Sequence, residues 1–510
     1  MPAIMPNSEI RILAGVPLDN TYRNTIYFTD AGSQVIYFAS RVVKVLDDQS
    51  YQRHGSDIMV NVLADDIYTS NYIMFKNTSF GDKWFYGFIT DIEYINNVTS
   101  RIKFEIDVMQ TWAFDYTLHP CFVEREHALT DGIGDNIIPE NLEIGDYITR
   151  EEIQPLELLS MKIVVAATFD ENLADAGGGM YGYVYSGLHY NVFETADEAN
   201  SFLTNATNNA KSDQIVSIFM IPSVFIVEAN SPPGKFELAI DKNITDIDGY
   251  VPHNKKLFTS PYNFITVNNM QGTAAMYKYE YFSTTNCIFD IGGDLSCNPN
   301  VICYPKNYNN EQLAITEKIT MSGYPQCAYT IDAYRAWLAQ NGASTGVTTL
   351  GSAFALIAGI VSMANPATAP AGIAMAAGGA SGVASSMAGI YEHSIQPDQA
   401  YGPSGGDALV ALGIKYLVFQ KTTIRKSFAE RIDGYFDMYG YQTNAFKIPN
   451  INTRPHWNYV KTKDATITGS MPANDLAQII SNFNNGITFW KNGHEVGDYS
   501  LNNEVVTNGQ

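Results

Sequence analysis

The sequence predicts a β-rich protein, mainly β with α+β parts. We expect an antiparallel sandwich or barrel-like module, a second mixed domain, and an inserted apolar helical hairpin. Three observations lead to this prediction: charged and apolar residues alternate over 101–108, helix and strand patterns mix after residue 155, and residues 336–391 contain no charged side chain. A chain of 510 residues is long enough for several such domains.

The alternation near the start places Ile102, Phe104 and Ile106 on one face of a strand and charged residues on the other. This period of two is typical of a half-buried antiparallel strand. Segments 35–46 and 84–95 are rich in aromatic and β-branched residues, so they are also predicted to be strands. Residues 1–154 are therefore predicted to form the β module.

The next domain, residues 155–335, is predicted to be of the α+β type. Its patterns indicate a strand at 162–168, a helix at 196–211, a strand at 215–221 and a short helix at 330–340. The apolar insertion is assigned to residues 336–395.

The last part of the chain, residues 396–510, is predicted to be β-rich and to return to the first module. Strand-like runs at 414–419 and 435–441 indicate this. The apolar insertion is thus expected to lie between folded parts.

The insertion consists of two apolar arms, residues 345–364 and 371–391, joined by a proline-bracketed turn at 365–370. Each arm, as a helix, would be about 30 Å long, roughly the thickness of the hydrocarbon core of a bilayer. A stripe of small residues suits close helix packing in lipid: Gly351, Ala355 and Gly359. The residues expected to contact lipid are Leu350, Phe354, Ile357, Ile360, Val361, Ile373, Val383 and Ile390.

Insertion of these arms is expected to be conditional. The six Leu, Ile, Phe and Val residues from 350 to 361 supply only about −2 to −4 kcal/mol. Glu392 and His393 follow the second arm, and protonation near pH 6 would reduce the charge at its border, giving a modest pH dependence of exposure. The alternative is a buried Ala- and Gly-rich core hairpin, with a solvated helix end after it.

The charge balance argues against a surface that grips nucleic acid. The chain has 53 Asp and Glu against 31 Lys and Arg, a net charge of −22, and phosphate binding depends on basic residues. Residues 1–12 lack a basic region followed by an apolar core, so synthesis in a cytoplasm is expected. The five cysteines are an odd number in a chain without a signal peptide, so reduced thiols are expected: Cys121, Cys287, Cys297, Cys303 and Cys327. The spacing of the last four matches no paired zinc-ligand pattern, so buried, apolar packing is favoured over a metal site.

No motif predicts an enzyme, a metal or a cofactor. Gly177, Gly179 and Gly182 satisfy G-x-G-x-x-G, but β-like residues follow them, so a strand turn or loop is favoured over a dinucleotide site. Residues 124–127, Glu-Arg-Glu-His, are interpreted as a surface charge cluster or salt-bridge network rather than a metal or acid–base site. We predict a protein that is not an enzyme.

Four segments carry a resemblance to a known family: VPLDNTY at 16–22, KWFYGFIT at 83–90, FEIDVMQTW at 104–112 and FVEREH at 122–127. In this order they resemble the distal tail tube, or tail knob, protein of small short-tailed phages of the podovirus or picovirus type. The segments PYNF at 261–264 and YKYEYF at 277–282 extend the likeness across most of the chain.

The resemblance implies a homohexameric tube with a tail-tube-like β module at the tip of the virion tail, made in the host bacterial cytoplasm. It implies contacts with other tail proteins of the proximal tube or collar, and transient, non-specific passage of the viral DNA. In such proteins a long apolar loop plugs the lumen and is released to penetrate the host cell membrane. Residues 343–391 occupy the corresponding position.

Three rival interpretations remain open. A secreted pore-forming toxin would share the conditional hairpin but needs an export route. An envelope-degrading tail enzyme would need paired acids or a nucleophile in a cleft. A purely structural tube protein would keep the apolar hairpin in its core.

Overall fold

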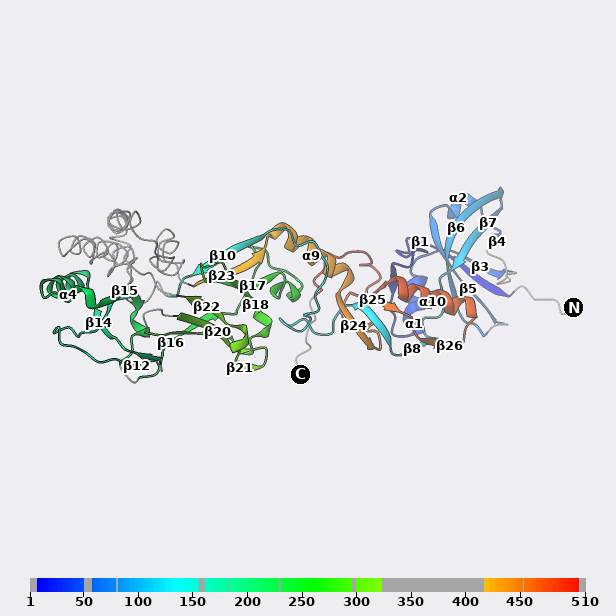
Figure 1. Ribbon diagram of the computed structural model, residues 1–510. Helices are drawn as coiled ribbons and strands as arrows, with labels where there is room; N and C mark the ends of the chain where they lie inside the picture. The colour runs from blue at the N-terminus through cyan, green and yellow to red at the C-terminus, as the bar shows by residue number, and fades with distance from the viewer. Residues whose placement is uncertain are drawn as a thin grey trace, which may run out of the picture. The chain divides into compact units, whose positions relative to one another are not determined.

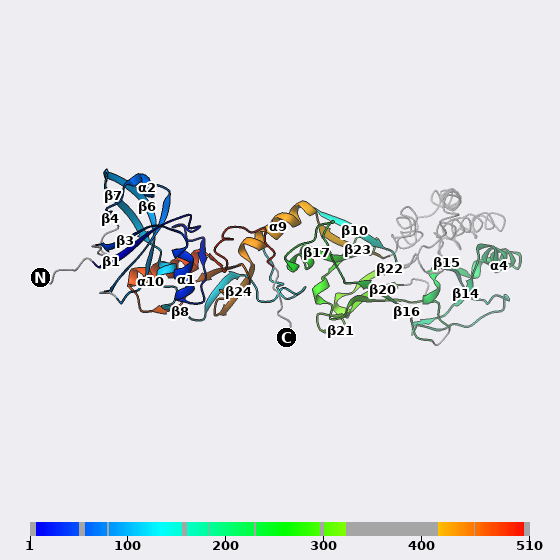
Figure 2. The same cartoon turned by 180° about the vertical axis from the view of Figure 1, so that it is seen from behind.

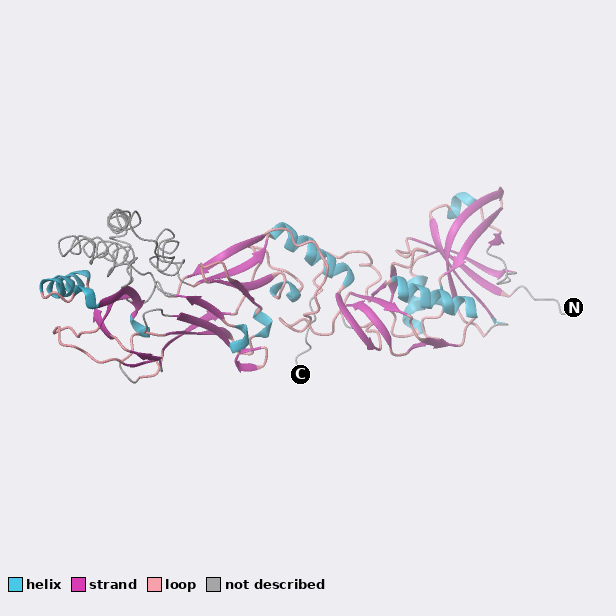
Figure 3. Ribbon diagram, in the orientation of Figure 1, coloured by secondary structure: helices cyan, strands magenta, loops and turns pink. Residues whose placement is uncertain are grey.

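The computed structural model describes residues 7–49, 57–78, 81–155, 161–182, 184–228, 231–295, 300–322, 417–452 and 454–503. The chain divides into two compact units. Unit 1 consists of three chain segments, Met1–Gly145, Gly249–Phe258 and Arg425–Gln510, and unit 2 consists of Asp146–Asp248 and Thr259–Ile424. Strands dominate both units (Figure 3), which confirms the predicted β-rich fold class.

Unit 1 contains a six-stranded antiparallel sheet in the order β3-β1-β5-β6-β7-β4 (Figure 1). Its strands are β1 (Ser8–Ala14), β3 (Val42–Gln49), β4 (Asp57–Val60), β5 (Ser70–Asn77), β6 (Phe85–Asn96) and β7 (Thr99–Ile106). The predicted strands at 84–95 and 101–108 are confirmed by β6 and β7. In β7, Ile102 and Phe104 are buried, while Lys103 forms an exposed ion pair with Asp91 at 2.8 Å.

A second sheet of unit 1 combines strands from both ends of the chain in the order β2-β27-β25-β9-β24. Its strands are β2 (Asn24–Ile26), β9 (Cys121–Glu126), β24 (Tyr441–Lys447), β25 (Trp457–Lys463) and β27 (Ile487–Trp490). Only the β2–β27 pair of this sheet is parallel. A small antiparallel pair, β8 (Tyr116–Leu118) and β26 (Ile467–Gly469), completes the strands of the described part of unit 1. The C-terminal segment therefore packs with the N-terminal one.

The helices of unit 1 are short. They are α1 (Ala31–Ala39), α2 (Ala64–Ile67), α3 (Val108–Thr111), the 3-10 turn η4 (Lys255–Phe258), α9 (Lys426–Tyr439) and α10 (Ala473–Asn485). Helix α10, seen from behind in Figure 2, contacts β25, β26 and α3. The amide of the buried Gln34 in α1 donates to the backbone oxygen of Gln110 in α3 at 2.9 Å, which ties these two helices together.

Two predicted strands are wrong because they are helices in part. Segment 35–46 begins inside α1, where Asp30 caps the helix by accepting from the backbone N–H of Ser33 at 2.9 Å. Segment 435–441 is the end of α9 followed by the start of β24. In both helices buried residues repeat at helical spacing on one face, Gln34 and Phe38 in α1 and Ile432 and Phe436 in α9.

The described part of unit 2 contains three sheets of three or more strands and one two-stranded hairpin. The orders are β10-β23-β17-β18, β14-β11-β15, β12-β13 and β16-β19-β20-β21, with β22 also paired to β20. The strands are β10 (Tyr147–Ile153), β11 (Met161–Ala167), β12 (Gly179–Tyr181), β13 (Val184–Ser186), β14 (His189–Phe193), β15 (Ile215–Pro222), β16 (Gly234–Asp241), β17 (Asn263–Asn268), β18 (Ala274–Tyr277), β19 (Asn286–Gly293), β20 (Asn300–Tyr308), β21 (Glu311–Leu313), β22 (Ile319–Ser322) and β23 (Val418–Ile424).

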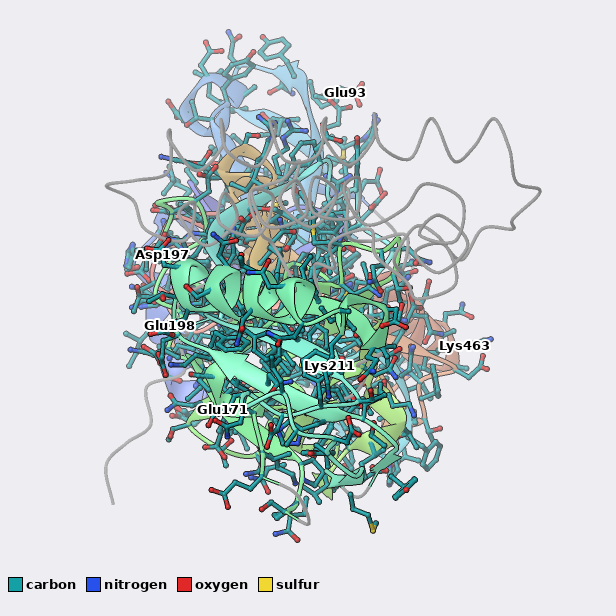
Figure 4. All side chains as sticks on the ribbon, turned by 60° about the vertical axis from the view of Figure 1, so that its left-hand side comes forward. Glu93, Glu171, Asp197, Glu198, Lys211 and Lys463 are labelled. Carbon is teal, nitrogen blue, oxygen red and sulfur yellow. The ribbon has the colours of Figure 1, made fainter. Side chains whose placement is uncertain are left out.

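The predicted strands at 162–168 and 215–221 and the helix at 196–211 are confirmed by β11, β15 and α4 (Ala196–Asn208). Thr195 and Glu198 form a capping box at the start of α4, where Figure 4 labels Asp197 and Glu198. Short 3-10 turns connect other strands: η2 (Ser212–Gln214), η3 (Ser223–Phe225), η5 (Tyr279–Tyr281) and η6 (Ile315–Glu317).

The domain boundaries predicted from the sequence remain predictions, and the compact units divide the chain differently. Unit 2 begins at Asp146 rather than at residue 155, because β10 pairs with β23. The short segment Gly249–Phe258 belongs to unit 1 although it lies within the sequence of the second predicted domain.

Among the described residues, none of the helices has both the length and the apolar character needed to span a bilayer. The predicted apolar arms, the short helix at 330–340 and residues 414–416 lie outside the described residues.

Candidate functional site

The residues predicted to contact lipid, to pack the hairpin or to border it all lie outside the described part of the chain. They are Leu350, Gly351, Phe354, Ala355, Ile357, Gly359, Ile360, Val361, Ile373, Val383, Ile390, Glu392 and His393. Their roles stay predictions.

The glycine motif is a strand turn, as its sequence context indicates. Gly179 begins β12, and Gly182 has a φ of 57° in the turn toward β13. Tyr181 pairs with Val184 across the hairpin. Because a strand rather than a helix follows the glycines, the segment lacks the helix N-terminus that a dinucleotide phosphate needs.

In the described part of the chain, every buried charged side chain belongs to unit 1 and none belongs to unit 2. They are Asp107, Glu126, His127, Glu140, Lys256, Asp433, Asp437 and Arg454. All but Asp107 belong to a set that we call the polar junction, in which Glu126 is joined only through its chain neighbours and pairs with Lys447 and Asn450 outside the set. It comprises Arg125, Glu126, His127, Asp131 and Glu140 from the first segment of unit 1, Tyr250, His253, Asn254 and Lys256 from the second, and Asp433, Asp437, Tyr441, Arg454 and Asn503 from the third.

Glu140 connects the three segments of unit 1. Its carboxylate pairs with Lys256 at 2.5 Å and with Arg125, and it accepts from the backbone N–H of Gln442 at 3.2 Å. Burial, and after it the charge of Arg125, lowers the pKa of Lys256 to about 7. A buried carboxylate with partners in three segments fixes their relative positions, because removal of either charge leaves the other desolvated.

Residues 124–127 form a salt-bridge network as predicted, but the surface location is wrong for half of them. Glu124 is half-buried and pairs with Lys461 at 2.9 Å, whereas Glu126 and His127 are fully buried. The pairing register shifts between Arg125 and Val123 on both neighbouring strands. Such shifts disturb the alternation of faces along a strand, and β9 ends at Glu126, so consecutive charged residues can both be buried.

His127 is a buried, neutral histidine in this arrangement. Its Nδ1 accepts from the backbone N–H of Tyr459 at 2.6 Å, and its Nε2 lies 3.2 Å from the backbone oxygen of Asp437. Burial and the nearby charges of Arg454 and Arg125 hold its pKa well below the usual value. The ring therefore joins β9 to β25 and α9 as a hydrogen-bonding group.

Two carboxylates of α9 hold the middle segment of unit 1. Asp433 and Asp437 are four residues apart and so lie on one helix face. Asp433 accepts from the Tyr250 hydroxyl at 2.7 Å and from the backbone N–H groups of His253 and Asn254 at 2.7 and 2.9 Å. Asp437 accepts from the side-chain amide of Asn254 at 2.6 Å. The prediction of a strand at 435–441 missed this polar face of α9.

Strand β24 carries an exposed apolar surface, which we call the edge patch. In the described sheet β24 has a neighbour, β9, on one side only. Phe446 stands opposite Phe122 across the pair, and their side chains are 74% and 38% exposed. Ile448 continues the patch and lines a pocket of about 390 Å³ with Phe28, Phe114, Tyr116 and other residues of unit 1. An exposed apolar patch on a strand edge is typical of an assembly surface.

The described cysteines are Cys121, Cys287 and Cys303, and all three are free and buried, as predicted. Burial raises the pKa of Cys287 to about 12 and that of Cys303 further. Such thiols pack as small apolar side chains. Cys297 and Cys327 lie outside the described residues.

This chain is similar to known phage tail proteins. Residues 228–504 match the family described as the C-terminal domain of tail knob protein gp9 of Bacillus phage phi29, and residues 6–117 match the N-terminus of the caudoviral major tail protein. Tail knob protein gp9 of Bacillus phage B103 is 28% identical, and that of Bacillus phage phi29 is 25% identical; each comparison covers 98% of this chain and 99% of the relative.

A solved structure has the same fold. The tail knob protein gp12 of bacteriophage C1 superposes with a TM-score of 0.70 at 14% identity, covering 98% of this chain and all of that chain. The likeness therefore extends over both units.

Proposed function

Because the chain belongs to the tail knob protein family represented by gp9 of Bacillus phage phi29, we propose that it forms the distal tube of a phage tail and penetrates the host cell membrane during genome ejection. As a tail knob protein it is a structural component of the virion tail. The proposal adds that six copies form a ring and join other tail proteins. It also adds that the viral DNA passes through the ring and that the apolar arms first plug the lumen and then enter host lipid.

The uncharged stretch at 336–391 is the observation that carries the membrane function. A chain with a net charge of −22 that keeps 56 consecutive residues free of Asp, Glu, Lys, Arg and His must shelter them from water. A ring of copies can shelter such arms against one another, whereas a single chain would expose a large apolar patch. In lipid the same residues are already removed from water, so one apolar segment suits both the assembled ring and the membrane-inserted state.

The acidic balance of the chain supports DNA passage without retention. Tight DNA binding requires Lys and Arg to neutralise phosphates, and acidic residues exceed basic ones by 22 in this chain. A wall with negative charge would repel the phosphate backbone. We therefore propose transient, non-specific contact with DNA, and a role that requires no enzyme activity.

The edge patch is proposed as a contact between copies in the ring. Phe446 is 74% exposed on an edge strand of unit 1, and a second copy would bury it. We expect Phe446→Asp to shift the protein from rings to monomers in light scattering. Tyr185→Asp is a matched control, because Tyr185 is 73% exposed but lies in unit 2. Rings that persist in Phe446→Asp would remove the edge patch from the proposal.

The membrane function is tested by dye leakage from liposomes. Phe354→Asp combined with Ile357→Asp places two charges in the first arm, and each charge costs about 2.5 to 3.5 kcal/mol at a helix centre in the membrane. We expect leakage to be lost while the ring remains. Tyr68→Asp with Val98→Asp is the matched control, because it adds the same charge at exposed apolar positions of unit 1. Leakage that survives in the arm variant would refute the assignment.

A further inference from the structure

The polar junction contains three side chains with metal-ligand atoms that face one another. His253, Asp433 and Asp437 each offer one such atom, and these atoms all lie within 4.8 Å of one another. His253 Nδ1 is 3.2 Å from Asp437 Oδ2. Ligands of a tetrahedral zinc ion, bound at about 2.0 to 2.1 Å, are roughly 3.3 Å apart. The observed separation therefore suits two ligands of one cation as well as a hydrogen bond.

A buried polar atom beside this group lacks a partner. Asn503 is 1% exposed and directs its side-chain amide at Asp437, to which Nδ2 donates. Its Oδ1 has no hydrogen-bond partner within the part of the chain that the structure describes. The amide therefore faces Asp437 with its nitrogen, and this contact fixes the orientation of that carboxylate.

The charges of the group also favour a cation. Asp433 and Asp437 are both buried on the same face of α9, so two carboxylates share a small space. Burial raises the pKa of Asp437, and the charge of Asp433 adds to this effect. Either a proton or a positive ion can relieve such a pair.

The ligand types select the class of cation. Calcium and magnesium prefer oxygen ligands, whereas an imidazole nitrogen with carboxylate oxygens suits zinc and similar ions. The side chain of His253 is 42% exposed, which gives solvent a route to an otherwise buried site. The Tyr250 hydroxyl and the backbone N–H of His253 both donate to Oδ2 of Asp433 and orient it, as second-shell groups do in metal sites.

We propose that His253, Asp433 and Asp437, with Asn503 beside them, bind one divalent transition-metal ion of the zinc class. The ion would connect the middle segment of unit 1, which carries His253, to the C-terminal segment, which carries the other three. Because it would bind the folded unit, it would stabilise unit 1 in proportion to its concentration relative to its dissociation constant.

The test uses the full chain, first depleted of metal with a chelator and then supplied with Zn²⁺. We expect one zinc per chain by elemental analysis after gel filtration, together with a rise in the unfolding temperature. His253→Gln and Asp437→Asn should each weaken zinc binding about 10- to 100-fold, the usual loss when a metal site is disturbed. Far-UV circular dichroism checks that both variants fold, and the partly exposed His253 makes its variant the safer of the two.

A matched control distinguishes this site from adventitious binding. His456 forms another histidine–carboxylate pair, with Glu495 at 2.5 Å, and His456→Gln should keep full zinc binding. Equal zinc retention by wild type, His253→Gln and Asp437→Asn would overturn the proposal. Loss of zinc in His456→Gln alone, or retention of Ca²⁺ but not Zn²⁺, would overturn it as well.

Discussion

Unit 2 is held together by apolar packing, whereas unit 1 adds a buried network of charges. The core of unit 2 gathers strand residues such as Phe219, Phe289 and Ile291, all fully buried. Unit 1 has several smaller apolar clusters, and the polar junction lies where its three chain segments meet. Apolar contacts are non-directional, but a carboxylate such as Glu140 accepts only certain partners. We infer that the polar junction specifies which segments combine in unit 1.

The difference between the two units predicts that substitution of Glu140 causes the largest loss of unfolding free energy. Glu140→Gln leaves Lys256 and Arg125 without a carboxylate in a buried place, so unit 1 should lose about 3 to 5 kcal/mol of unfolding free energy. Hydrogen exchange read separately for peptides of each unit measures this loss. The control is Glu237→Gln in unit 2, where the carboxylate is 51% exposed and pairs with Lys306 at 2.7 Å; its cost should be about 0 to 1 kcal/mol. Equal losses in the two variants would contradict the comparison.

The contribution of Asp107 to the stability of unit 1 depends on pH. Its buried carboxyl accepts from Tyr72 and from two backbone N–H groups, yet burial raises its pKa to about 6. The folded state therefore holds a proton between about pH 4 and pH 6 that the unfolded chain releases. Stability from this group is present at low pH and is lost as the pH rises to 6, by about 3 kcal/mol in all.

Asp107→Asn removes this titration while its oxygen can still cap α3. The variant should gain stability relative to wild type as the pH rises from 4 to 7.5, measured by urea unfolding. Asp91→Asn serves as the control of opposite sign, because the Lys103 hydrogen bond lowers the pKa of the exposed Asp91. Its stabilising contribution is lost as the pH falls. Parallel pH profiles for wild type and Asp107→Asn would show that burial of this carboxyl has no such effect.

Ile291 gives the smallest effect and tests unit 2. Ile291→Val removes one buried methylene from the apolar core, so unit 2 should lose about 0.5 to 1.5 kcal/mol. The loss should be the same at pH 5 and pH 8, because the described core around it contains no buried charged side chain. A loss that changes strongly with pH would mean that charges contribute to this core too.

The sequence predicts the regular strands well. Alternation gives β7, where one face is buried and the other is wet. Aromatic and β-branched residues give β6, and apolar runs give the buried strands β11 and β15. It fails at α1 and at the end of α9, where aromatic and β-branched residues have strand propensity but one helix face is buried. Propensity is a weak guide when tertiary packing decides.

The polar junction could be predicted only in part. Charged residues such as Glu126 and Asp433 are interpreted as surface residues by default, since the sequence does not show which distant segments will neutralise them. One signal was present: Asp433 and Asp437 share a face of α9 with Ala429, which is buried. The family, in contrast, could be identified from short strings such as FEIDVMQTW, whereas the composition of residues 336–391 left both membrane insertion and a buried core hairpin open.

The central claim concerns those apolar residues, and one measurement tests it most directly. Purified wild-type protein and a variant that lacks residues 345–391 are compared in dye leakage from liposomes, with ring size followed by light scattering. We expect leakage from wild type and none from the variant, with rings of the same copy number in both. Leakage from neither protein, or collapse of the variant ring, would contradict membrane penetration and indicate a lumen plug or a core hairpin.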